Sequence, residues 1–153
     1  LQYPLQSFEI ENNLRIYPND IGLLICTYPF ELKAEILRDN NTDEKAENII
    51  LQTAKGGIYE ALAADFLHKA KFQNLHFYRN EAGTVEMEFL IESTQGIIPV
   101  EIKAGRKGSR SLNTILSDNT IKYGYKFSSQ NIGTINKKVT MPLYMMMFLG
   151  KEV

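Results

Sequence analysis

The chain has 153 residues, of which 44% are hydrophobic and 23% charged, which is enough for one domain with its own buried core. Its single cysteine, Cys26, excludes an intramolecular disulfide bond and a four-cysteine zinc site, and its apolar neighbours predict a buried core residue. No apolar run approaches the roughly twenty residues that cross a bilayer, and the N-terminus shows no secretory signal. We therefore expect one soluble, cytoplasmic domain over residues 1–153, with no membrane partner.

The net charge of −1 hides two parts of opposite sign. Residues 1–100 contain 8 Lys and Arg against 15 Asp and Glu, whereas residues 101–153 contain 9 against 3. Arg106, Lys107 and Arg110 lie close together at the start of the basic part. They are candidate phosphate contacts, although a solvated basic loop explains the same pattern.

The N-terminal elements are predicted to be short. Residues 14–17 alternate weakly and predict a strand, and residues 18–20 predict a turn that ends in a helix N-cap. A helix over 21–28 is expected to end before Pro29, and the apolar spacing then predicts a second short helix over 31–37.

A longer helix over 44–72 follows, with Thr42 or Asp43 of a polar loop as its cap. Gly56 and Gly57 interrupt its apolar pattern. Each glycine costs a helix interior about 1 kcal/mol relative to alanine, so we expect a break, a kink or a close backbone approach there.

Three consecutive strands are predicted next. Residues 75–79 form the first, and a turn at 80–83 leads into a hairpin whose arms are 85–92 and 97–105, joined by 93–96. Strands that follow one another through short turns form an antiparallel meander.

The remaining elements are a helix over 109–116 capped by Ser109, a strand over 120–127, a loop at 131–134, and a strand end with a short buried helix over 139–149. A helix between two strands crosses over to a further strand. The expected fold class is therefore α/β, with a mixed central sheet that contains an antiparallel meander and is flanked by helices.

The predicted hairpin brings charged residues together. Glu88 lies on one arm, and Glu101 and Lys103 lie on the other, two residues apart and so on one face. All three adjoin apolar runs, where a charge is costly unless it is paired or used. Glu60 on the preceding helix is placed to extend the acidic cluster. Metal binding and a buried structural ion pair both explain this pattern.

Several segments resemble the C-terminal domain of unknown function that is found on bacterial and archaeal AAA-type P-loop ATPases. The resemblance covers nearly the whole chain and follows a fixed order, given by residues 16–24, 57–67, 75–79, 86–91, 98–105, 115–116 and 141–144. It implies that the chain is the C-terminal fragment of a longer ATPase, in keeping with a first residue that is Leu1 and not methionine. No P-loop motif occurs here, so ATP hydrolysis would belong to an N-terminal domain of the same protein.

That family is similar to the PD-(D/E)XK, or restriction-endonuclease-like, fold. The similarity implies that Glu60 is the helix acid, that Glu88 replaces the usual aspartate, and that Glu101 and Lys103 form the (D/E)xK pair. Glu88, Glu101 and the carbonyl of Ile102 would then hold Mg²⁺ or Mn²⁺, while Lys103 orients or deprotonates the attacking water.

Two functions follow as expectations. The first is a nuclease-like domain that hydrolyses phosphodiester bonds of DNA with a divalent metal ion. The alternative is a non-catalytic module that binds DNA or a protein, or regulates the attached ATPase, because one fold supports many functions. The sequence leaves the oligomeric state open.

Overall fold

The computed structural model describes residues 2, 4–38, 49–72, 74–105 and 108–149. Within these residues the fold is mixed α/β, with a six-stranded mixed sheet flanked by helices, as expected. The predicted cap at Thr42 or Asp43, the predicted helix start at 44–48, and the candidate phosphate contacts Arg106 and Lys107 lie outside the described residues.

The sheet has the strand order β1-β2-β3-β4-β6-β5 in the described part of the chain. Its strands are β1 (His76–Arg79), β2 (Glu86–Ser93), β3 (Gly96–Ile102), β4 (Gly124–Ser128), β5 (Gly133–Ile135) and β6 (Lys138–Pro142). The first three strands pair antiparallel, which confirms the meander, and β4 then pairs parallel to both β3 and β6. The parallel step from β3 to β4 is made through a helix, as the sequence predicts.

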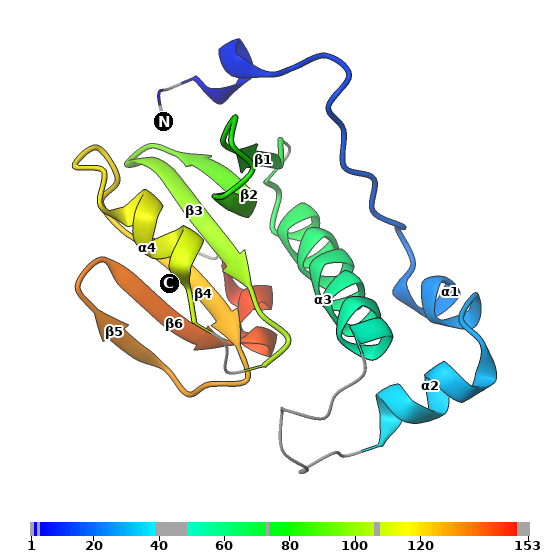
Figure 1. Ribbon diagram of the computed structural model, residues 1–153. Coiled ribbons are helices and arrows are strands. Elements are labelled where there is room, and N and C mark those ends of the chain that lie inside the picture. Colours follow the sequence, from blue (N-terminus) through cyan, green and yellow to red (C-terminus); the bar gives the residue numbers. More distant parts are fainter. Residues whose placement is uncertain (1, 3, 39–48, 73, 106–107, 150–153) are drawn as a thin grey trace.

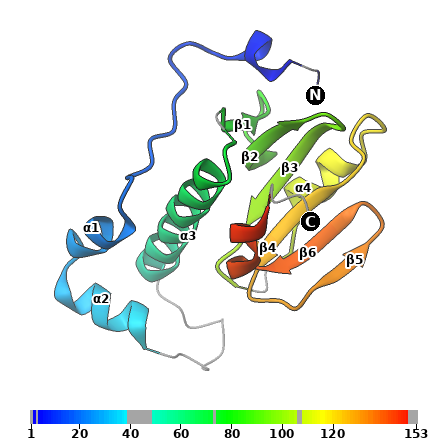
Figure 2. The same ribbon diagram turned by 180° about the vertical axis from the view of Figure 1, so that it is seen from behind.

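Helices cover the two faces of the sheet. The helices of the described residues are η1 (Leu5–Phe8), α1 (Ile21–Cys26), α2 (Phe30–Leu37), α3 (Ile49–Lys69), α4 (Arg110–Leu116) and η3 (Leu143–Phe148). Helix α4 lies on one face, whereas α3 and η3 lie on the other (Figures 1 and 2). Helices α1 and α2 contact α3 at the outer side of the molecule. None of the helices in the described ranges has both the length and the apolar character that crossing a membrane requires.

The core forms one layer on each side of the sheet. Val100 and Ile102 of β3 pack with Phe89 of β2 and Leu67 of α3 in the first layer. The second layer lies under α4 and is built from Met87, Leu90, Ile97, Leu112, Ile115, Leu116 and Ile121, together with Leu5. Burying one such side chain contributes about 1.5–3 kcal/mol, so the two layers fix the register of β2 against β3.

The predicted interruption at Gly56 and Gly57 is wrong, because α3 continues through both glycines. A Cβ atom added at either position would meet nothing within 4 Å, so no close backbone approach explains them either. The buried face of the helix, which includes Leu51 and Leu67, outweighs the glycine cost, since tertiary packing supplies most of the stability of a helix in a protein.

Two expectations for the N-terminal region are also wrong. Residues 14–17 form no strand, and Ile16 is 89% exposed. Cys26 is exposed and not in the core, because α1 has no buried residues. The predicted N-cap is confirmed, since Asp20 Oδ1 accepts a hydrogen bond of 2.9 Å from the backbone N–H of Leu23.

The C-terminal elements agree in part. The strand end and short helix expected over 139–149 are present as β6 and η3, but η3 is not a buried helix, because Met146 is its one buried residue and Tyr144 is 61% exposed. The predicted loop at 131–134 contains the start of β5. Strand β4 begins at Gly124, four residues later than expected. Ser109 occupies the N-cap position of α4, yet its side chain makes no capping hydrogen bond.

Candidate functional site

Strands β2 and β3 bring the three hairpin residues together. The Lys103 ammonium lies 3.2 Å from Glu88 Oε1 and 3.5 Å from Glu101 Oε1. Lys103 directly follows β3, and its backbone N–H donates to the carbonyl of Phe127 on β4 at 2.9 Å. The side chain therefore extends from a backbone that is held between two strands of the sheet.

The cluster is buried and only partly hydrogen-bonded. The side chains of Glu101, Glu88 and Lys103 are 2%, 12% and 29% exposed. Glu88 Oε2 and Glu101 Oε2 are buried and have no hydrogen-bond partner among the described residues. An unpartnered buried oxygen costs free energy, so each carboxylate keeps one oxygen for which a further donor or a cation would be favourable.

Burial and charge act in opposite directions on the pKa values in this cluster. Burial raises the pKa of Glu88, and the Lys103 ammonium opposes that rise in part. Burial alone would lower the pKa of Lys103, but the carboxylates of Glu88 and Glu101 outweigh it and raise that pKa above its ordinary value. Lys103 is therefore an ammonium at neutral pH.

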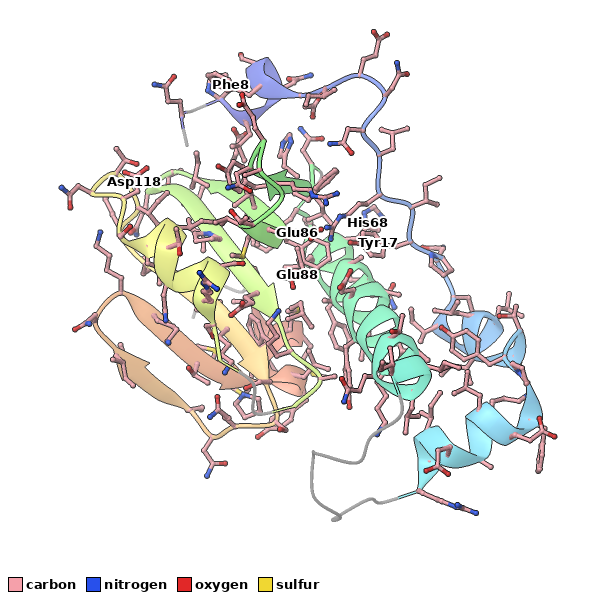
Figure 3. The ribbon with its side chains drawn as sticks, viewed as in Figure 1. Phe8, Tyr17, His68, Glu86, Glu88 and Asp118 are labelled. Carbon is pink, nitrogen blue, oxygen red and sulfur yellow. The ribbon has the colours of Figure 1, made fainter. Side chains whose placement is uncertain are left out.

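Glu60 of α3 faces a pocket of about 440 Å³ beside the cluster. Glu60 and Glu88 both line this pocket, while Glu101 does not appear among its described lining residues. Figure 3 shows Glu86, Glu88 and Tyr17 near one another between β2 and α3. Burial raises the pKa of Glu60, and Arg15 opposes that rise.

Arg15 of the N-terminal segment enters the same pocket, which the sequence did not indicate. Its guanidinium contacts the carboxylate of Glu86 and lies 3.6 Å from Glu60 Oε2. It also stacks 4.7 Å from the centre of the Phe77 ring. Arg15 and Glu86 are 71 positions apart, and no periodicity within one element relates residues at that distance.

Tyr17 fixes the segment that carries Arg15. Its ring centre lies 5.6 Å from that of Phe89 on β2, at a tilt of 41°. Tilted aromatic pairs at this separation are favourable, so the contact holds the segment against the sheet. Burial raises the pKa of the Tyr17 phenol, while Arg15 opposes that shift.

Lys126 on β4 is a second buried lysine near the acids. It is 4% exposed and lies opposite Glu101 in the β3–β4 register, and its ammonium donates to Gln130 Oε1 at 2.8 Å. Burial lowers the pKa of Lys126, and Glu101 opposes that shift. The alternating pattern of residues 120–127 could have indicated this lysine, because alternation assigns residue 126 to one face of the sheet.

The side chains of two other predicted site residues make none of these contacts. Ile102 is 4% exposed, with its side chain in the core. Arg110 is exposed at the first position of α4.

The acidic cluster offers few side-chain ligands for a metal ion. In the described ranges, no three His, Cys, Asp or Glu side chains group closely enough to hold a metal. Glu88 and Glu101 nevertheless offer two free carboxylate oxygens, the donor type that hard divalent cations prefer. Glu60, the expected third acid, pairs with Arg15. The residues fit a site with few protein ligands, in which Arg15 holds the third acid.

Comparison with known proteins adds one match. A family model described as "Domain of unknown function (DUF4143)" matches residues 55–144, which include all the described strands and the residues Glu60, Glu88, Glu101 and Lys103. Arg15 lies outside the matched range. The searches of curated proteins and of solved structures each returned no match. The chain therefore belongs to the DUF4143 family of domains.

Proposed function

We propose that this domain hydrolyses phosphodiester bonds of DNA with Mg²⁺ or Mn²⁺, on a restriction-endonuclease-like fold. The observation that carries the proposal is the convergence of Glu88 and Glu101 on the Lys103 ammonium, with a free oxygen on each carboxylate. Domains of this family commonly occur with AAA ATPases, which supports an N-terminal ATPase domain as a partner in the same protein.

Glu88, Glu101 and the carbonyl of Ile102 would hold the metal ion. When bound, the ion supplies positive charge that stabilises the developing negative charge on the phosphate. Hard cations with few protein ligands bind weakly and retain several waters, in keeping with two free carboxylate oxygens at this site.

Lys103 orients the reacting groups. Its ammonium has three N–H donors and is paired with two carboxylates, so a remaining donor is available for the attacking water or a phosphate oxygen. Glu60 lines the pocket beside Glu88 and assists through water. Arg106, Lys107 and Arg110 would contact phosphates further along the DNA backbone.

A cleavage assay tests the proposal. The purified protein is incubated with supercoiled plasmid, with single-stranded DNA and with RNA, in Mg²⁺, Mn²⁺ or a chelator. We expect metal-dependent nicking of DNA that falls by about 10²-fold or more in Lys103→Ala. Lys69→Ala, at an exposed lysine paired with Asp65, is the matched control and retains activity. Absence of cleavage by the unmodified protein, or equal activity in both variants, contradicts the proposal.

A second candidate function is a non-catalytic module that binds the attached ATPase domain. Large apolar side chains are exposed on α1, on α2 and at the start of α3, namely Leu23, Phe30, Leu37, Ile49 and Ile50, and α1 and α2 both contact α3. Large exposed apolar patches on a protein often mark interaction surfaces. Under this reading Lys103 and its two carboxylates form a structural ion pair.

A binding measurement separates the two candidates. Association with the separately purified ATPase domain is measured for the unmodified domain, for Leu23→Ser with Phe30→Ser, and for Ile132→Ser, an exposed apolar residue elsewhere. Loss of association only in the α1–α2 variant, together with no cleavage by the unmodified protein, supports the module. A salt titration with DNA, comparing the unmodified domain with Arg110→Ala, tests nucleic acid as the partner instead.

A further inference from the structure

The segment before α1 reaches the acidic pocket from outside the sheet. Figure 1 shows it as a blue strap that runs past β1 and then along the outer side of α3. Arg15 lies near the middle of this strap and is 23% exposed, so most of its side chain is enclosed by the pocket.

The pocket recognises the guanidinium from several sides. Glu60 of α3 and Glu86 of β2 contact it, and Phe77 of β1 provides an aromatic face. A planar guanidinium suits this combination of carboxylates and a ring better than an ammonium does. The described residues that line the pocket also include Glu88, the proposed metal ligand.

The strap is fastened at a few points and not along its length. Leu5 is buried in the core layer under α4, Glu9 Oε1 lies 3.1 Å from His76 Nδ1, and the Tyr17 ring packs on Phe89. Between the strap and strands β1 and β2 there is a cavity of about 660 Å³. The apolar side chains between the anchors are exposed, with exposed fractions of 60–89% for Phe8, Ile10, Leu14 and Ile16. Lifting residues 9–16 therefore uncovers little core.

We propose that Arg15 is a built-in competitor of the divalent metal ion, and that the strap closes the acidic pocket until Arg15 is displaced. This inference rests on the proposed nuclease function. With Arg15 and Lys103 in place, two positive charges offset half of the charge of the four carboxylates, which belong to Glu60, Glu86, Glu88 and Glu101. Arg15 therefore weakens the attraction for a further cation and occupies the Glu60 carboxylate. Withdrawal of Arg15 frees the Glu60 carboxylate, which then joins Glu88 and Glu101 as a third acid for the ion. With the strap closed, no three acidic side chains of the described residues group closely enough to hold a metal ion.

Mn²⁺ binding to the full chain, measured by calorimetry, tests the competition. We expect Arg15→Gln to bind Mn²⁺ about tenfold more tightly than the unmodified protein, because a neighbouring positive charge has been removed. Arg15→Lys keeps the positive charge but loses the planar guanidinium, so its Mn²⁺ affinity is expected to lie between those of the unmodified protein and Arg15→Gln. Arg38→Gln, at an exposed arginine paired with Glu35, is the matched control and leaves the affinity unchanged.

The outcomes distinguish the two proposals. Equal Mn²⁺ affinity in the unmodified protein and Arg15→Gln, with loss of binding in Glu88→Gln, overturns the strap and leaves the metal site standing. No Mn²⁺ binding by any of these proteins overturns both.

Proteolysis gives a second readout that needs no activity. Mn²⁺ is expected to speed tryptic cleavage after Arg15, because displacement exposes that bond, and to leave cleavage after Lys71 unchanged. Lys71 lies in an exposed turn after α3. An unchanged rate at Arg15 in saturating Mn²⁺ contradicts the strap.

Discussion

The Lys103 ammonium lies within 3.5 Å of two carboxylates whose side chains are 2% and 12% exposed, so both acids share this cation. We expect Lys103→Ala to lower the free energy of unfolding by about 3 kcal/mol, because it leaves buried charges without a partner. Urea denaturation at neutral pH measures the loss.

Lys69→Ala is the control for this prediction. It removes an exposed lysine that pairs with Asp65 one turn earlier on α3, and such surface pairs contribute about 0–1 kcal/mol. Equal losses in the two variants would mean that the buried cluster contributes no more than a surface ion pair.

Lys126 gives a prediction with a defined pH dependence. Burial lowers the pKa of Lys126 in the folded state. Between this lowered pKa and the unfolded value of 10.5, the unfolded chain therefore binds more protons than the folded chain does. Stability attributable to Lys126 therefore rises with pH across this window, by at most about 1.4 kcal/mol per pH unit. Below the window both states are protonated, and the cost of the buried charge is fully present.

The measurement compares unfolding of the unmodified protein with that of Lys126→Met at several pH values from neutral to alkaline. The unmodified protein should gain stability relative to the variant as the pH rises. A difference that stays constant would show that Lys126 titrates as it does in the unfolded chain.

The sequence predicted part of the site and missed the rest for a physical reason. Glu88, Glu101 and Lys103 were found because a hairpin has period two and a short turn, which fix their neighbours. Arg15 and Glu86 meet only because an irregular segment folds back over a strand, and no local pattern encodes such a contact.

At the scale of an element, α3 shows that packing overrides propensity. Gly56 and Gly57 lie inside a continuous helix, and a Cβ atom at either position would have free space. We expect Gly56→Ala and Gly57→Ala each to raise the free energy of unfolding by about 0.5–1 kcal/mol, because alanine has less backbone freedom to lose. Urea denaturation of the single variants provides the measurement.

Gly124 is the matched control, because a Cβ there would lie 2.8 Å from Pro99 Cγ and 3.0 Å from its carbonyl oxygen. Gly124→Ala should therefore destabilise the protein by about 1–3 kcal/mol through overpacking. Destabilisation by the α3 substitutions would instead point to a functional bend of that helix.

The elements that the sequence predicted correctly share strong local signals. The meander and the helix before β4 have clear periodicity, and Asp20 caps α1 as expected. The predictions of a strand at 14–17 and of a loop at 131–134 were wrong, because strand formation in both segments depends on pairing with another strand at the edge of the sheet. Residues 14–17 find no partner strand in the described structure, whereas β5 is formed by its pairing with β6.

For the whole molecule, the candidate site lies between parts that differ in stability. The sheet and its two core layers hold Glu88 and Glu101, while residues 9–16 of the strap are joined to the sheet through the ion pairs of Glu9 and Arg15 and the stacking of Arg15 on Phe77. Segments with few buried apolar contacts open at lower free energy than the core does. Opening of the strap should therefore precede global unfolding, and hydrogen exchange at residues 9–16 should be faster than on β2 and β3.

Metal binding by such a site must appear as a gain in stability of the whole chain. An ion that binds only the folded state stabilises it by about 1.4 kcal/mol at ten times its dissociation constant, which corresponds to a rise in Tm of roughly 3–5 °C for a chain of this size. We expect this rise with Mn²⁺ in thermal unfolding, its reversal by a chelator, and a larger rise in Arg15→Gln, in which no guanidinium must first be displaced. In Glu88→Gln with Glu101→Gln the rise should vanish, because both free carboxylate oxygens have been replaced by amides. A rise of equal size in that double variant would place the metal elsewhere on the protein and would remove the physical basis for a nuclease centre at Lys103.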